Sequence, residues 1–157
     1  MPKKLKYGII SGTPNYTYTC KIKTSEVLSA KSGRYVVFDT GSAHCKVAPD
    51  NATKISGYIE DSLTIDASTE EAFPVASNPD QFVCELPYAS AGTAQTSLTA
   101  AVLLTLFSDI GDIFVDGSDI QYADVAQSEN IMRIVGGDIT IPTLYITILN
   151  ETLGNVT

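Results

Sequence analysis

The residues whose types and spacing most directly suggest chemistry are the Asp-Thr-Gly triplet at 39–41, which follows an apolar run at 36–38. A carboxylate at the end of a strand can act as an acid or a base when a second carboxylate shares its proton. The same triplet is typical of a tight turn, because Asp accepts hydrogen bonds from the backbone that follows it and Gly adopts positive φ without strain. The pattern therefore allows a catalytic and a structural interpretation of Asp39.

Residues 36–42 resemble the catalytic loop of the pepsin-type aspartic proteases. A chain with one such loop would have to form a retropepsin-like homodimer, in which Asp39 and its copy share a proton. Residues 134–138 would then be the later apolar-Gly motif and residues 55–59 the flap. The flap would begin only 16 residues after Asp39, and Gly136 lies too far along the chain for a compact retropepsin. The turn interpretation is favoured, and the protease is the alternative hypothesis.

The densest group of acids lies in the second half of the chain and consists of Asp109, Asp112, Asp116, Asp119 and Asp124. A calcium loop of the EF-hand type places acids at alternate positions, followed by a Gly. The spacing from Asp112 to Asp116 does not fit that pattern. We therefore expect these acids to form the solvated face of a hairpin and predict no metal site.

The cysteines and the histidine do not form a recognisable centre either. Cys20, Cys45 and Cys84 are far apart, and His44 is the only histidine. A zinc site needs clustered nitrogen and sulfur ligands, so none is predicted. Cys45 and Cys84 fall at apolar positions of strand-like patterns, which indicates buried reduced thiols. Because the known nucleotide-binding, hydrolase and metalloprotease motifs are also missing, we predict no cofactor, no catalytic residue and no enzyme activity.

Charge is distributed unevenly along the chain. Residues 1–34 contain seven Lys or Arg and one acid, whereas residues 35–157 contain three and 17, so the net charge of −8 divides into +6 and −14. This asymmetry predicts a basic arm on an acidic body. An acidic body repels phosphate backbones, so no nucleic-acid partner is expected. No apolar run approaches the about 18 residues of a membrane helix, and residues 1–10 do not look like a signal peptide.

Composition and patterning favour a β fold. Ile, Val and Thr make up 43 residues, and short apolar runs alternate with turn residues. A hairpin is predicted at 34–39 and 43–48, with Cys45 facing inward, and a close backbone approach is predicted at Gly57. Further strands are expected at 55–59, 63–67, 73–75, 82–86, 112–115, 120–125, 131–135 and 144–149.

The domain organisation follows from these patterns. We predict a mainly β protein with a small β-barrel or β-sandwich-like body. It comprises an extended basic arm (1–27), a first β subdomain (28–90), a small polar linker and a second β subdomain (98–157). A short helix is predicted at about 97–106, capped by Thr96 or Ser97, although a buried strand fits that apolar segment equally well.

One resemblance covers most of the chain, about residues 28–149. Its pieces are residues 28–39, with Gly33 before a Val-rich strand, then 45–48 (Cys-Lys-Val-Ala), 55–59 (Ile-Ser-Gly-Tyr-Ile), 110–113 (Ile-Gly-Asp-Ile), 120–123 (Ile-Gln-Tyr-Ala) and 136–138 (Gly-Gly-Asp) before a final strand rich in Ile. In this order they resemble the head-decoration, or capsid cement, proteins of tailed phages, including the lambda-type trimeric ones. In that family a basic or polar N-terminal arm precedes a small β-rich body.

The resemblance implies a structural virion protein, made in the host cytoplasm, that binds the outer capsid surface and stabilises it. Its expected partners are the major capsid protein and further copies of itself, with a trimer favoured. The capsid-contacting residues would lie in the arm: Lys3, Lys4, Lys6, Tyr7, Tyr16, Tyr18, Lys21 and Lys23. Removing residues 1–20 is then expected to leave the body folded. A phage tail or receptor-binding β module is a third hypothesis.

Overall fold

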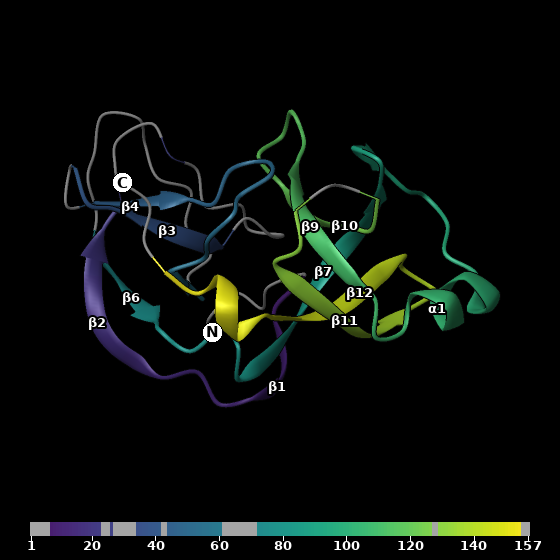
Figure 1. The fold of residues 1–157 in the computed structure, drawn as a ribbon, viewed down its shortest axis with the longest axis horizontal. Helices are drawn as coiled ribbons and strands as arrows, with labels where there is room; N and C mark the ends of the chain where they lie inside the picture. Colours follow the sequence, from purple (N-terminus) through teal and green to yellow (C-terminus); the bar gives the residue numbers. More distant parts are fainter. Residues whose placement is uncertain are drawn as a thin grey trace, which may run out of the picture.

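The computed structural model describes residues 7–22, 26, 34–41, 44–60, 72–126 and 129–154. Over these residues the protein is mainly β, as the sequence predicts, and its strands form two sheets (Figure 1). The first sheet contains β2 (Tyr16–Lys21), β3 (Tyr35–Asp39), β4 (His44–Val47), β5 (Gly57–Tyr58) and β6 (Ala72–Ala76). The second contains β1 (Ile9–Gly12), β7 (Phe82–Ser90), β8 (Thr93–Ala94), β9 (Ile110–Val115), β10 (Gln121–Asp124), β11 (Met132–Asp138) and β12 (Thr143–Ile148). The helix α1 spans Ala100–Leu106, and a 3-10 turn (Asn150–Thr152) follows β12.

The second sheet closes on itself into a barrel. β7 pairs in parallel with β10 and antiparallel with β12, and β9 and β11 complete the circuit between them. Closure leaves these strands without open edges, which is how small barrels avoid edge-to-edge association. The interior of this second barrel is apolar and includes the fully buried Ile113, Ala123, Ile134, Leu144 and Ile146. β1 extends the sheet along the other part of β7, at Phe82–Cys84.

The first sheet is ordered β2-β6-β5-β3-β4, and its two outer strands also meet. An isolated parallel bridge joins Ile22, directly after β2, to Cys45 in β4. The strands thereby surround a second apolar interior, the first barrel, filled by Ile22, Val36, Cys45, Ile59, Phe73 and Val75. The predicted close approach at Gly57 is confirmed, because a Cβ there would lie 2.4 Å from Val75 Cγ1. The predicted inward side chain of Cys45 is confirmed as well.

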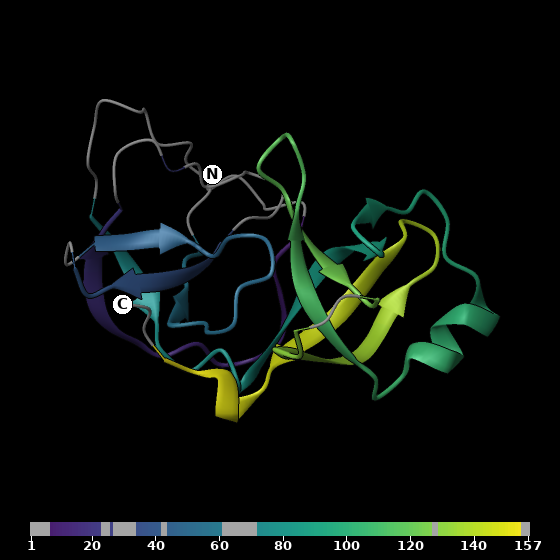
Figure 2. The ribbon, with the colours of Figure 1, turned by 45° about the horizontal axis from the view of Figure 1, so that its top comes forward.

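The strand β3 contributes to both cores, which explains its continuous apolar sequence. Side chains alternate between the two faces of a strand. Val36 accordingly points into the first barrel, whereas Tyr35 and Val37 pack into the core that the first barrel shares with the second. Tyr58 lies edge-on between the Tyr35 and Phe82 rings, with centroid distances of 5.0 and 5.6 Å. The two barrels are therefore packed into one body (Figure 2).

One buried side-chain amide makes three hydrogen bonds between the two barrels. Gln121, at the start of β10, is fully buried, and its Oε1 accepts the Tyr35 N–H at 3.0 Å. Its Nε2 donates to the carbonyl oxygens of Tyr35 and Ala48, each at 3.0 Å. These three bonds satisfy backbone groups beside β3 and β4 that are buried at the junction of the barrels.

Residues 7–22 belong to the body and do not form a separate arm. β1 pairs with β7, and β2 pairs with β6 from Tyr16 to Lys21. Removing residues 1–20 would delete β1 and most of β2, each of which pairs with a strand of the body. β1 and β7–β12 belong to the second sheet and β2–β6 to the first, so the chain crosses between the sheets after β1 and again after β6, at 77–81.

The segment at 97–106, which the sequence left open between helix and strand, is helical from Ala100. Its N-cap is Thr99, whose Oγ1 accepts the Val102 N–H at 3.2 Å, so the predicted caps Thr96 and Ser97 lie three and two residues too early. Leu106 is buried against the second barrel, whereas Leu104 points away from it. In the described part of the chain, no helix is long and apolar enough to span a membrane. The strand predicted at 63–67 lies outside the described residues.

We predict that Gln121→Leu lowers the free energy of unfolding by about 3 kcal/mol, because it removes the hydrogen-bond partner of two buried backbone groups, the Tyr35 N–H and the Ala48 carbonyl, while the Tyr35 carbonyl keeps the Ala48 N–H. Urea unfolding followed by circular dichroism measures the change. Gln81→Leu, at an exposed position between β6 and β7, is the matched control and should be close to neutral. Equal effects of the two substitutions would show that the junction does not depend on this amide.

Candidate interaction surface

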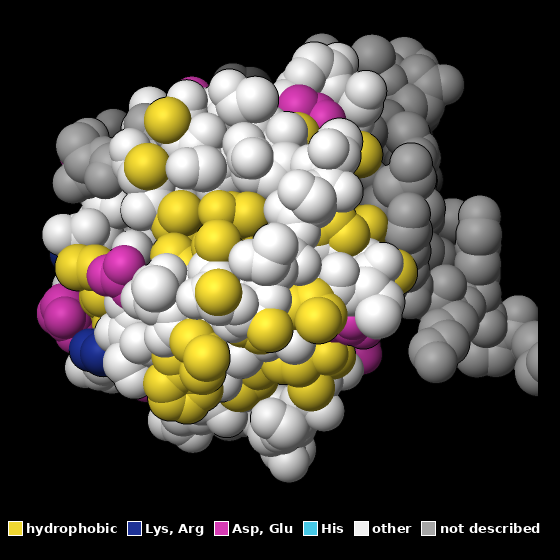
Figure 3. Space-filling view, turned by 90° about the vertical axis from the view of Figure 1, so that its right-hand side faces the viewer, with side chains coloured by type: hydrophobic (Ala, Val, Ile, Leu, Met, Phe, Trp, Pro, Cys, Tyr) yellow, Lys and Arg dark blue, Asp and Glu magenta, His cyan; other side chains and the backbone are white. Residues whose placement is uncertain are grey.

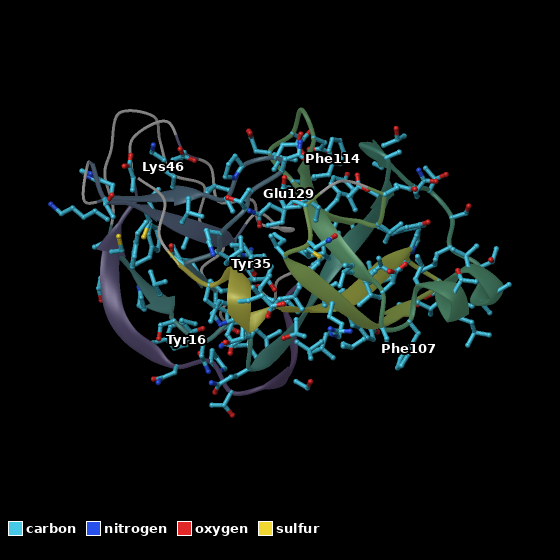
Figure 4. All side chains as sticks on the ribbon, viewed as in Figure 1. Tyr16, Tyr35, Lys46, Phe107, Phe114 and Glu129 are labelled. Carbon is cyan, nitrogen blue, oxygen red and sulfur yellow. The ribbon has the colours of Figure 1, made fainter. Side chains whose placement is uncertain are left out.

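The end of the molecule that carries α1 exposes apolar side chains. The helix presents Leu104, which is 77% exposed, and is followed by Phe107, which is 59% exposed. We call the exposed apolar residues of this end the α1 surface: Val102, Leu104, Phe107, Ile139 and Ile141. Figure 3 shows hydrophobic side chains gathered on this face, and Figure 4 shows Phe107 at the outer end of the molecule. Exposed patches of this kind on soluble proteins mark contact sites for other molecules.

A shallow groove lies between α1 and the β11–β12 hairpin. It has a volume of about 720 Å³ and is lined mainly by apolar groups, including Leu103, Phe107 and Tyr145. Gly137 makes the close packing there possible, because a Cβ at this position would lie 2.6 Å from the Thr143 carbonyl oxygen and 3.0 Å from Leu103 Cδ1. The hairpin thus holds α1 at a fixed distance from the barrel wall.

The α1 surface is also nearly free of charge. Residues 86–108 contain no Asp, Glu, Lys or Arg, although the whole chain has a net charge of −8. The carboxylate of Asp138, at the rim of the groove, accepts the N–H and O–H of Thr140 at 2.8 and 2.6 Å. These hydrogen bonds lower the pKa of Asp138 and direct its carboxylate to the turn. The surface is therefore suited to a contact driven by apolar burial and not by ion pairs.

Asp39 has the structural role that the turn interpretation gives it. Its Oδ1 accepts the Gly41 N–H at 3.0 Å, and its Oδ2 lies 2.6 Å from Lys46 Nζ on the neighbouring strand. The proposed flap at 55–59 is instead a buried segment of the first barrel, and residues 136–138 belong to β11 of the second barrel. The segment 55–59 runs beside β3, where the Phe38 N–H donates to Ser56 Oγ at 2.8 Å, whereas residues 136–138 lie in the other sheet.

The group of acids between 109 and 124 is not a uniform solvated face. Asp109 and Asp119 are exposed, and Asp116 organises its turn by accepting the N–H groups of Ser118 and Ile120 and the hydroxyl of Tyr122. The expectation is wrong for Asp112 and Asp124, which are fully buried. Asp124 accepts the N–H groups of Ala91, Gly92 and Ala126 and so holds the turn after β7. Among the described residues, no group of three His, Cys, Asp or Glu is placed to hold a metal ion.

Asp112 is the buried acid with the weakest compensation. Its Oδ1 accepts the N–H of Ile113 at 2.7 Å, and its Oδ2 has no hydrogen-bond partner among the described residues. Burial raises the pKa of Asp112 to about 7, the N–H of Ile113 opposes the rise, and the carboxylates of Glu129 and Asp50 add to it. Burial therefore favours the neutral, protonated form of this carboxyl.

This carboxyl makes stability depend on pH in a defined direction. Its pKa is higher in the folded than in the unfolded chain, so its stabilising contribution is complete below pH 4 and is lost as the pH rises through 7. We predict that Asp112→Asn gains stability relative to the wild type by about 3 kcal/mol between pH 4 and pH 8. Urea unfolding at both pH values measures this, and the exposed Asp109→Asn should show no such change. Parallel pH profiles for wild type and Asp112→Asn would contradict the assignment.

The residues predicted to form the contacting arm are distributed differently. Lys3, Lys4, Lys6 and Lys23 lie outside the described residues, and Tyr18 and Lys21 are in β2. Tyr7 is buried, and its carbonyl oxygen accepts a hydrogen bond from Arg34 Nη1 at 3.3 Å. Tyr16 is partly exposed and donates its hydroxyl to Glu60, and partial burial and Glu60 raise the pKa of Tyr16. β2 and α1 lie at opposite ends of the molecule (Figure 1).

The sequence analysis did not single out the α1 surface. The available signal was the combination of an apolar segment, Leu98–Phe107, with the absence of charge over residues 86–108. It predicts a short helix or a buried strand at 97–106, and an apolar run does not by itself show which of its side chains face the barrel.

Comparison with known proteins gives no match for this chain: no family model fits the sequence, and no curated protein or solved structure is similar to it.

Proposed function

We propose that the chain is a structural virion protein that binds the outer surface of a phage capsid and stabilises it, without catalysis. The observation that carries the proposal is the α1 surface, an exposed apolar area with almost no charge at one end of a rigid β body. A surface of this kind is suited to binding a macromolecule and not a small substrate, because its apolar side chains lie on the outside of the molecule.

The partner assigned to the α1 surface is a further copy of the same chain. Copies with a net charge of −8 repel one another over most of their surfaces. The α1 surface is a place where two copies can approach without bringing like charges together. Leu104 and Phe107 would be the central apolar contacts, with a trimer favoured by the resemblance to decoration proteins. An oligomer binds a repeating shell with higher affinity than one copy does, because binding of each further copy becomes intramolecular once the first copy is bound.

The contact with the shell is assigned to the basic N-terminal segment. Residues 1–34 carry +6, and Lys3, Lys4 and Lys6 precede the first described residue. This charge is suited to an acidic capsid surface, and its contribution weakens as salt screens it.

The test is co-sedimentation of labelled protein with the heads of the phage that encodes the chain. We expect saturable binding that weakens with salt and falls at least tenfold when Lys3, Lys4 and Lys6 are changed together to Ala. A Lys54→Ala, Arg133→Ala double variant alters basic residues elsewhere and should bind like the wild type. Heads that bind no wild-type protein at low salt would overturn the proposed function, and equal loss in both variants would overturn the role of the N-terminal segment.

A further inference from the structure

Two of the three thiols lie at the seam that closes the first barrel. Cys20 is in β2 and Cys45 in β4, the outer strands of the sheet, and the isolated bridge from Ile22 to Cys45 joins these strands. Near this seam, the Glu26 carboxylate accepts the N–H of Val47 at 3.2 Å. The seam has no continuous ladder among the described residues, in contrast to the pairings of β2 with β6 and of β3 with β4.

The two thiols face the same interior. Cys20 precedes Ile22 by two residues, so both side chains point to the same side of β2. Ile22 and Cys45 are buried in the core of the first barrel, and Cys20 packs against that core. Burial, and after it the neighbouring Cys20 thiol, raise the pKa of Cys45. Cys20 is partly exposed and also donates its S–H to the Lys21 carbonyl oxygen at 3.5 Å.

We propose that Cys20 and Cys45 are a redox pair that forms a disulfide and locks the first barrel across its seam. Cys20 is the residue that an oxidant reaches first, because Cys45 lies beneath the surface. The pair is suited to this because both thiols face one interior and the bridge between Ile22 and Cys45 already joins their strands two residues from Cys20.

The oxidant is a small disulfide compound such as oxidised glutathione. The Cys20 thiolate attacks one sulfur of that compound, forms a mixed disulfide and releases one thiolate. The Cys45 thiolate then attacks the Cys20 sulfur, forms the Cys20–Cys45 bond and releases the second thiolate. Two protein thiols lose two protons and two electrons, and the small disulfide is reduced to two thiols.

The third cysteine provides a matched control. Cys84 is fully buried in the core shared by the two barrels, on β7, and belongs to a different cluster from Cys45. No other cysteine lies in its cluster, so among the described residues Cys84 has no thiol beside it with which to form a disulfide. Oxidation should therefore leave Cys84 unchanged.

The experiment treats the full-length protein with oxidised glutathione at pH 8 and then counts free thiols in denaturant. We expect one remaining thiol in the wild type, a peptide that joins residues 20 and 45 in non-reducing mass spectrometry, and a melting temperature higher by roughly 5–10 °C. Cys84→Ser should form the same bond, whereas Cys20→Ser and Cys45→Ser should not.

Three results would overturn the proposal. They are retention of all three thiols, a cross-link that includes Cys84 or a second molecule, and a reaction that stops at a Cys20–glutathione adduct. Because the cross-link is mapped in the wild-type chain, the test does not require any variant to fold. It also does not depend on the proposed function, since no capsid is present.

Discussion

The structure depends on the burial of β3 from both sides. Val36 fills the first barrel, and Tyr35 and Val37 fill the core shared with the second barrel, so the strand cannot keep its packing if either barrel is lost. Gln121 fixes the relative position of the two barrels at this apolar contact. Its amide accepts the N–H of Tyr35 and donates to the carbonyl oxygen of the same residue. The two barrels therefore fold as one unit, and surfaces at opposite ends of the body stay at a fixed separation.

The elements that could be predicted from the sequence are those whose structure is determined by interactions between neighbouring residues. The β3–β4 hairpin follows from alternating apolar residues and from an Asp-Thr-Gly turn whose side chain bonds its own backbone. The close approach at Gly57 follows from the need to exclude a Cβ beside Val75. In both cases residues that are neighbours in sequence or strand register determine the outcome.

The predictions that differ from the structure concern contacts between distant residues. Residues 9–21 appear polar and interrupted, yet they pair with β7 and β6, more than 50 positions along the chain. Asp112 lies in an acid-rich segment that is typical of an exposed hairpin, yet its side chain is fully buried in the fold. The sequence of α1 does not show which leucines are exposed, because Leu104 and Leu106 are the same residue type and differ only in the side of the helix that they occupy. Local pattern does not carry this information.

We therefore assign two functions to two parts of the molecule. The uncharged α1 surface would bind further copies of the chain, and the basic N-terminal segment would bind the shell. The most direct measurement of its central claim is the mass in solution at neutral pH, by sedimentation equilibrium, of the wild type and of Leu104→Glu. We expect the wild type to be a multiple of 16.7 kDa, with three copies favoured, and Leu104→Glu to be a folded monomer. Ile10→Glu, at an exposed apolar position on β1, should keep the wild-type mass. A monomeric wild type, or an oligomer that Leu104→Glu leaves intact, would contradict the account.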